Sequence, residues 1–324
     1  MGMQRNGRAV AAAAATAFVA STTLAGGSAQ ATPAPAGAVV VNDVLTISGT
    51  NAADQITLDF SALDSVVVDL GDTFGTRRFA VGTFHAATVD LQSGDDQFRT
   101  ISGGALVDVP TTVTAGNGND TVTTGAGRDV LVGGNGADVV NGGVGTDVEL
   151  LGSGDDTAAW NPGDGNDTID GGPGRDTLIF NGSNGDELMS LSANGESAVF
   201  LRNLGNIRMD LDGVERLDLA TLGGVDTVTI GDLSGTAVTT AEIGLAATTG
   251  AADAKDDTVQ VFGTQQADQV DVTADGGSVD VTGLAAQTSV TGGDPTDRLQ
   301  IDTLGGDDSV TVSDNARALL TIQP

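Results

Sequence analysis

Seven aspartates recur at a nearly constant spacing in the middle of the chain, and each follows a glycine by two positions. Cut into nines from Ala115, the sequence reads AGNGNDTVT, TGAGRDVLV, GGNGADVVN and GGVGTDVEL. A fifth unit keeps the spacing, two extra residues intrude around Trp160 and Asn161, and two more units follow. A period of nine indicates a repeated supersecondary unit, which neither a helix nor an ordinary hairpin requires. The aspartates are Asp120, Asp129, Asp138, Asp147, Asp156, Asp167 and Asp176.

These residue types are suited to binding a hard cation. Glycine lets the chain bend tightly with a positive φ, and such a turn can point several carbonyl oxygens inward. The aspartate adds a carboxylate to the same turn. Calcium takes about six to eight oxygen ligands of these two kinds. The alternative is that the aspartates only cap turns, because Asp and Gly are common turn residues.

The end of each unit predicts a short strand that must pack against its neighbours. Two places after the aspartate most units carry an apolar residue, whereas the fourth unit carries Glu149. In a strand of about three residues the middle side chain can face a core. One unit cannot bury that side chain alone, so the units must stack. The apolar residues are Val122, Leu131, Val140, Ala158, Ile169 and Leu178.

The units match the G-G-x-G-x-D-x-U-x nonapeptide, so the chain resembles secreted bacterial proteins with haemolysin-type calcium-binding (RTX) repeats. The resemblance implies a right-handed parallel β-roll in which calcium lies between one unit and the unit two places later. It therefore pairs Asp120 with Asp138, Asp129 with Asp147, Asp138 with Asp156 and, across the insertion, Asp147 with Asp167 and Asp156 with Asp176. About three to five calcium ions are implied. The implied glycine ligands are Gly116, Gly118, Gly125, Gly127, Gly134, Gly136, Gly143, Gly145, Gly152, Gly154, Gly172 and Gly174.

The composition is consistent with a fold that bound metal ions stabilise. The chain has 44 acidic and 13 basic residues, a net charge of −31, which argues against nucleic acid as a partner because phosphate binding needs clustered Lys and Arg. Hydrophobic residues make up 39% and alternate regularly, so a chain disordered throughout is not expected. Cysteine is absent, so disulfides cannot stabilise the fold, and bound metal is the remaining way to cross-link a glycine-rich chain.

The N-terminus predicts export. Arg5 and Arg8 precede the apolar run 9–20, and Ala29-Gln30-Ala31 provides a cleavage site, so residues 1–31 read as a secretory signal peptide. A retained first membrane helix is the alternative. Residues 32–37 are expected to be a linker, and no later segment is long and apolar enough to span a bilayer. The expected location is extracellular. RTX toxins as a family instead carry an uncleaved C-terminal secretion signal. They also carry a long hydrophobic pore region and modified lysines, and neither is visible here, so their cytolytic activity is not expected.

The flanks predict more β-structure around a central block of residues 115–180. We expect an N-terminal β segment at 38–114, a β segment with a degenerate turn at 181–257, and a module at 258–324 that resembles 44–100. The two modules share five residues at matching positions. Those of the first are Gly49, Thr50, Ala53, Asp54 and Gln55, and those of the second are Gly263, Thr264, Ala267, Asp268 and Gln269. Alternating residues favour a single all-β solenoid, with terminal β-sandwiches as the alternative. Residues 240–255 are alanine-rich enough for a short helix or a loop.

Catalytic motifs are sparse. His85 is the only histidine, so an H-E-x-x-H zinc site is impossible, and no G-x-S-x-G motif accompanies it. The carboxylate pairs 155–156 and 307–308 lie inside G-x-D turns, where metal ligation or solvation explains them better than glycosidase chemistry. Trp160 is expected to fill space. We therefore expect no enzyme, but a calcium-binding structural or interaction scaffold that contacts cell-surface or matrix components. A secreted hydrolase with an unrecognised site in a flank is the alternative.

Overall fold

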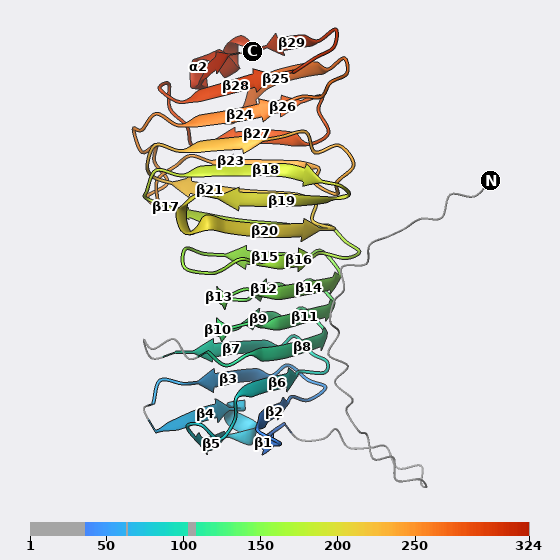
Figure 1. Ribbon diagram of the computed structural model, residues 1–324, viewed down its shortest axis with the longest axis vertical. Helices are drawn as coiled ribbons and strands as arrows, with labels where there is room; N and C mark the ends of the chain where they lie inside the picture. Colours follow the sequence, from blue (N-terminus) through green and yellow to red (C-terminus); the bar gives the residue numbers. More distant parts are fainter. Residues whose placement is uncertain (1–35, 63, 103–107, 324) are drawn as a thin grey trace, which may run out of the picture. The chain divides into compact units, whose positions relative to one another are not determined.

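The computed structural model describes residues 36–62, 64–102 and 108–323. Residues 34–324 form one compact unit, and its described part consists almost entirely of strands stacked in coils (Figure 1). The expected signal peptide, residues 1–31, lies outside the described residues. The first strand, β1 (Gly37–Val41), begins at the last residue of the expected linker.

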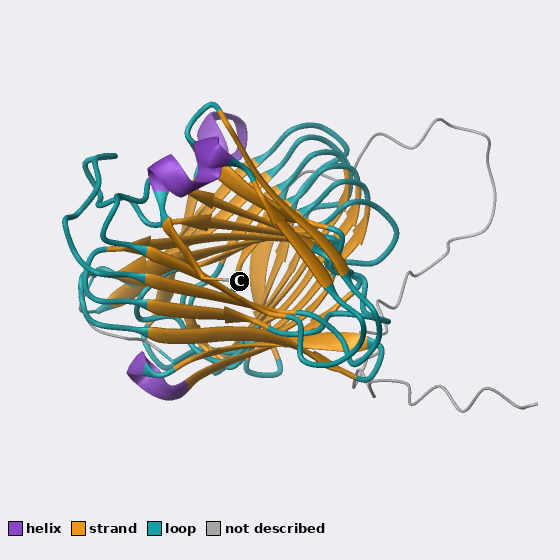
Figure 2. Ribbon diagram, turned by 90° about the horizontal axis from the view of Figure 1, so that it is seen from above, coloured by secondary structure: helices purple, strands orange, loops and turns teal. Residues whose placement is uncertain are grey.

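Two large sheets of 14 strands each lie opposite one another within the described residues, with loops joining them along both sides (Figure 2). We call them sheet A and sheet B. In spatial order, sheet A contains β1, β2 (Val44–Ser48), β6 (Ala86–Asp90), β8 (Thr111–Asn117), β11 (Val130–Asn135), β14 (Val148–Ser153), β16 (Thr168–Asp170), β20 (Ile207–Asp212), β19 (Ser197–Arg202), β18 (Leu188–Asn194), β22 (Thr227–Ile230), β24 (Thr258–Phe262), β28 (Arg298–Asp302) and β30 (Thr321–Gln323).

Sheet B follows the same path on the other side of the core. Its spatial order is β29 (Ser309–Val312), β25 (Gln269–Asp275), β26 (Ser278–Thr282), β27 (Gln287–Thr291), β23 (Thr240–Gly244), β21 (Arg216–Leu222), β17 (Thr177–Ser183), β15 (Thr157–Trp160), β12 (Val139–Asn141), β9 (Thr121–Thr123), β7 (Gln97–Ile101), β3 (Gln55–Asp59), β4 (Ser65–Asp69) and β5 (Thr76–Ala80). The remaining elements are the strand pair β10 (Ala126–Gly127) and β13 (Val144–Gly145), and the short helices α1 (Gly71–Phe74), η1 (Leu204–Asn206) and α2 (Asp314–Leu319).

The nine-residue units of the central block alternate between the two sheets, so two units make one coil of the solenoid. Leu131 of β11 lies opposite Val113 of β8 and Glu149 of β14, each 18 residues away, in parallel register. Across the insertion the step becomes 20 residues, and Ala158 lies opposite Leu178. The insertion therefore lengthens one coil without shifting the inward face.

Alternate side chains of the strands form the core, as the sequence pattern predicts. Val122, Leu131 and Val140 are at most 2% exposed. Trp160 is also buried, and its ring stacks on Phe180 with 4.1 Å between centroids. Its role is packing, as expected.

The flanks continue the same two sheets, so the expected all-β solenoid is confirmed and terminal sandwiches are absent from the described residues. Antiparallel hairpins interrupt the parallel order at β3–β4–β5, at β18–β19–β20 and at β25–β26–β27. The helix considered for residues 240–255 is wrong, because β23 occupies Thr240–Gly244 and the residues after it have no helix. Across the described ranges, no helix combines the length and apolar character needed to cross a bilayer.

Candidate metal centre

Each of the seven repeat aspartates stands directly before a strand, at the point where the glycine turn ends. Asp120, Asp138, Asp156 and Asp176 precede strands of sheet B, and Asp129, Asp147 and Asp167 precede strands of sheet A. All seven are at most 5% exposed. The turn thus places a carboxylate under the start of each strand, where it is shielded from water.

The aspartates form two hydrogen-bonded ladders, one beside each sheet. In five of the seven, the backbone N–H donates to Oδ1 of the aspartate one coil later. The distances are 2.8 Å for Asp120–Asp138, 2.7 Å for Asp129–Asp147, 2.7 Å for Asp138–Asp156, 2.9 Å for Asp147–Asp167 and 2.9 Å for Asp156–Asp176. All five pairs inferred from sequence are therefore brought together, including the two that span the insertion.

The second carboxylate oxygen, Oδ2, is the feature that calls for a cation. It is buried without a hydrogen-bond partner among the described residues in six of the seven aspartates, all except Asp167. Burying such an oxygen is costly unless a positive charge or a donor satisfies it. No group of three or more acidic or histidine side chains gathers as a possible metal site in the described ranges. A cation bound here would therefore take most of its ligands from turn carbonyls, as calcium does.

Glycine is required in these turns because successive turns lie in direct backbone contact. Gly136 has a φ of 133°, and the carbonyl oxygen of Gly118, one coil earlier, occupies the place where a Cβ would stand. Gly154 meets the carbonyl of Gly136 in the same way. Gly125 differs, because its nearest neighbour is the Thr100 side chain. Positive φ values occur at Gly116, Gly118, Gly127, Gly134, Gly136, Gly143, Gly152, Gly154 and Gly172, but not at Gly125, Gly145 or Gly174.

Burial disfavours the charged form of the turn carboxylates. This effect raises the pKa of Asp147 to about 8, with a further increase from the Asp167 carboxylate. Burial likewise raises the pKa of Asp167 to about 7 and that of Asp138 to about 6. The ladder hydrogen bonds from backbone N–H groups act in the opposite direction but are outweighed. A cation entering these turns would displace protons and relieve this electrostatic cost.

Glu149 departs from the repeat pattern and lies in the core in place of an apolar residue. It is 2% exposed and stands in register between Leu131 and Ile169. Its Oε1 accepts the Gly142 N–H at 2.7 Å. Burial raises its pKa well above the usual range, with smaller contributions from Asp167 and Asp147. The fourth unit therefore keeps its strand in register, and the buried Glu149 carboxyl group is hydrogen-bonded to the backbone of the turn before it.

The ladders continue outside the seven aspartates through residues that were not predicted as sites, among them Asp96 and Asp226. Asp96 and Asp226 are at most 2% exposed, and Oδ2 of each is unpartnered within the described part of the chain. The Asp96 N–H donates to Oδ1 of Asp120 at 2.8 Å, which extends the sheet B ladder one coil earlier. The signal was present in the sequence, because Gly94 and Gly224 stand two places before these aspartates.

The flanking modules carry the same turn, but there Oδ2 of the aspartate accepts hydrogen bonds from a threonine. Oδ2 of Asp54 accepts the N–H of Thr50 at 2.5 Å and its hydroxyl at 3.0 Å. At the other end of the chain, Thr264 donates its N–H to Oδ2 of Asp268 at 2.7 Å. The two modules that echo each other in sequence are thus alike in structure. Threonine supplies the donors that the central turns lack.

Fold and turns together define a parallel β-roll whose ladders of buried carboxylates are arranged to bind cations. Residues 114–149 and 163–187 match the model of the RTX calcium-binding nonapeptide repeat, in four copies. This match confirms the resemblance inferred from the motif, so the chain carries calcium-binding repeats of the RTX type. No curated protein matches the chain significantly.

Proposed function

We propose that the central block binds about three to five calcium ions through the paired aspartates and the glycine carbonyls, and that this binding drives its folding. The observation that supports the proposal is the buried, unpartnered Oδ2 on six of the seven aspartates. The residues fit calcium because both oxygen types are present in one turn. Calcium would neutralise the carboxylates there, while the chain positions them through the ladder hydrogen bonds.

We further propose that the protein is exported and acts outside the cell as a rigid scaffold for cell-surface or matrix components. Weak calcium sites fill where calcium is about millimolar, as in many extracellular settings. The candidate catalytic groups have structural surroundings that suit this role: His85 is exposed, and Asp308 accepts the Asp268 N–H at 2.9 Å. A zymogram panel on purified protein tests the hydrolase alternative, and activity in it would overturn the non-enzymatic role.

Calcium titration of the purified protein is the direct test of binding. Calorimetry should show at least three calcium ions per molecule, because three aspartate pairs precede the insertion. Circular dichroism should report a gain of β-structure over the same calcium range. Magnesium should be a poor substitute, since it demands tight octahedral geometry. Equal binding of the two metals, or no binding at millimolar calcium, would contradict the proposal.

A further inference from the structure

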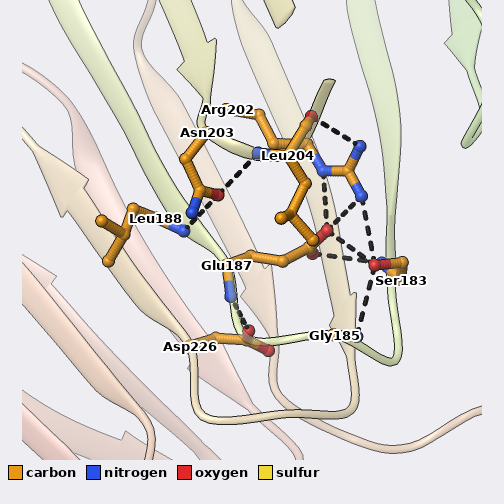
Figure 3. A network of polar contacts seen from close by, with 8 residues as sticks. All are labelled: Ser183, Gly185, Glu187, Leu188, Arg202, Asn203, Leu204 and Asp226. Carbon is orange, nitrogen blue, oxygen red and sulfur yellow. Dashed lines mark hydrogen bonds and ion pairs between the residues drawn. The ribbon is translucent and has the colours of Figure 1, made fainter. Parts of the chain in front are cut away.

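The turn that ends at Glu187 repeats the calcium-type turn with a glutamate in place of the aspartate. Its backbone N–H donates to Oδ1 of Asp226 at 2.8 Å, which is the ladder hydrogen bond (Figure 3). A Cβ on Gly182 would lie 2.5 Å from Oε2 of Glu187, and a Cβ on Gly171 would lie 2.6 Å from Oδ2 of Asp176. The Glu187 carboxylate therefore occupies the position that the aspartate carboxylates occupy in the central block.

Unlike those aspartates, Glu187 is fully partnered. Its Oε1 accepts hydrogen bonds from Nε of Arg202 at 2.7 Å, from Nη2 of the same guanidinium and from the Ser183 hydroxyl at 2.8 Å. Its Oε2 accepts the Ser183 N–H at 3.1 Å. Glu187 and Arg202 are 0% and 7% exposed, so both charges are withdrawn from water.

Arg202 is itself held in place on every side. Nη1 donates to the Leu204 carbonyl at 3.1 Å, and Nη2 donates to the Ser183 hydroxyl at 3.1 Å (Figure 3). The guanidinium also lies over the Trp160 ring, 5.4 Å from its centroid. Arg202 ends β19, the middle strand of the antiparallel β18–β19–β20 insertion. The inserted hairpin therefore holds a positively charged guanidinium in the turn that ends at Glu187.

We propose that the Arg202 guanidinium takes the place of calcium in the Glu187 turn, so that this turn closes without metal. The inference rests on the proposed calcium-binding function. It concerns a turn inside the repeat-matched residues 163–187, where the motif alone would predict another metal site. A guanidinium carries one charge and directed N–H donors, which suit a single carboxylate, and it needs no solution ion.

One consequence is that the central block adjoins a turn that closes without calcium, although Oδ2 of Asp226, one coil further on, is again unpartnered within the described residues. The sheet B ladder also ends in a glutamate there, since the Asp176 N–H donates to Oε2 of Glu215 at 2.7 Å. Phe180 lies between Trp160 and Phe200, with ring centroids 4.1 Å and 4.5 Å away, so an aromatic stack spans the boundary between β15 and β19. The hairpin β18–β19 then forms a metal-independent surface on which the central block closes when calcium arrives.

Hydrogen exchange on the purified protein in chelator, at neutral pH, tests the substitution. In the wild type the amides of β18 and β19 should be protected. Arg202→Met keeps the apolar stem but leaves Glu187 buried without its cation, so protection of these amides should fall at least about 100-fold, equivalent to about 3 kcal/mol. Arg208→Met is the matched control, because the Arg208 side chain is 47% exposed and bonds Asp210 at the surface. It should leave the protection unchanged.

Two further measurements separate the charge from mere packing. Millimolar calcium should restore protection in Arg202→Met, with one more bound ion per molecule than in the wild type. The double variant Glu187→Gln, Arg202→Met removes both charges, so it should recover most of the protection in chelator and gain no ion. Unchanged protection in Arg202→Met, a loss that calcium does not restore, or a double variant that fails to recover would each overturn the proposal. Wild-type protein without calcium binding would instead contradict the proposed function, which the titration measures separately.

Discussion

At the scale of single residues, the second oxygen of the turn carboxylate decides what each turn needs. Oδ2 of Asp138 has no partner among the described residues, Oδ2 of Asp54 is held by Thr50, and Glu187 is held by Arg202 and Ser183. The three solutions share the ladder hydrogen bond and the glycine contact. They differ only in the source of positive charge or donors, so only the first requires a metal ion.

Position in the ladder should determine how much calcium each aspartate holds. Asp138 lies between Asp120 and Asp156, whereas Asp176 lies between Asp156 and Glu215. Asp138→Asn should therefore remove about two bound ions and Asp176→Asn about one, because asparagine keeps the Oδ1 acceptor but loses the charge. Asp268→Asn is the control and should remove none. Calorimetric stoichiometry measures all three, and equal losses at Asp138 and Asp176 would refute calcium binding between successive turns.

The spacing of the repeat made the seven aspartates and their pairing predictable, since a period of nine specifies which residues stack. Glu149 and Arg202 were not predictable in the same way. The carboxyl of Glu149 bonds the Gly142 N–H, and Arg202 reaches Glu187 from a strand inserted 15 residues later. Contacts of this kind depend on where a hairpin folds back, which no local pattern in the chain encodes.

At the scale of the turn and strand, close backbone stacking should make the repeat glycines more sensitive than other glycines. Gly136 and Gly195 both have positive φ, but a Cβ on Gly195, between β18 and β19, meets nothing within 4 Å. Gly195→Ala should cost only the strain of the backbone, about 1–2 kcal/mol. Gly136→Ala should cost roughly 2–5 kcal/mol, because overpacking against Gly118 adds to that strain.

Urea unfolding in millimolar calcium would measure both glycine variants against the wild type. Gly136→Ala should also bind less calcium, while Gly195→Ala should bind as much as the wild type. A similar loss of stability in the two variants would show that φ strain alone explains the glycines. That result would remove the argument from stacked carbonyls.

The strands themselves were largely predictable from alternation, because inward residues such as Val279 and Val281 are buried as the pattern requires. The antiparallel hairpins were not, since alternation is the same in parallel and antiparallel strands. Residues 240–244 form β23, although their surroundings are rich in alanine. There the register with β21 and β27 outweighs the weak helical preference of the segment.

At the scale of the whole molecule, the chain carries a net charge of −31, and its fold buries part of the carboxylates. Without metal, the buried aspartates can avoid repulsion only by staying protonated. Their folded pKa values lie above the ordinary value of 3.8, at about 6 for Asp138, 7 for Asp167 and 8 for Asp147. Calcium and protons therefore compete for the same oxygens.

This competition predicts opposite pH dependences with and without calcium. A folded pKa raised above the unfolded value means that the metal-free fold binds more protons than the unfolded chain over this range. The stabilisation is complete below about pH 4 and is lost as pH rises through about 6 to 8. With calcium present, the ligands must lose those protons to bind the ion, so stability should rise with pH over the same window.

Urea unfolding at pH 4.5, 6 and 8, in metal-free buffer and in millimolar calcium, would measure both dependences. The metal-free protein should be least stable at pH 8, where calcium should stabilise it most. Parallel pH profiles in the two buffers would mean that the buried aspartates are not the groups that bind calcium. Asp54 and Asp268 should contribute little to the difference between the buffers, because threonine donors hold their Oδ2 atoms. The difference should come from the aspartates with raised pKa values in the central block and, at Asp96 and Asp226, in the turns on either side of it. Asp147→Asn, which replaces the group with the pKa of about 8, should reduce that difference most between pH 6 and 8.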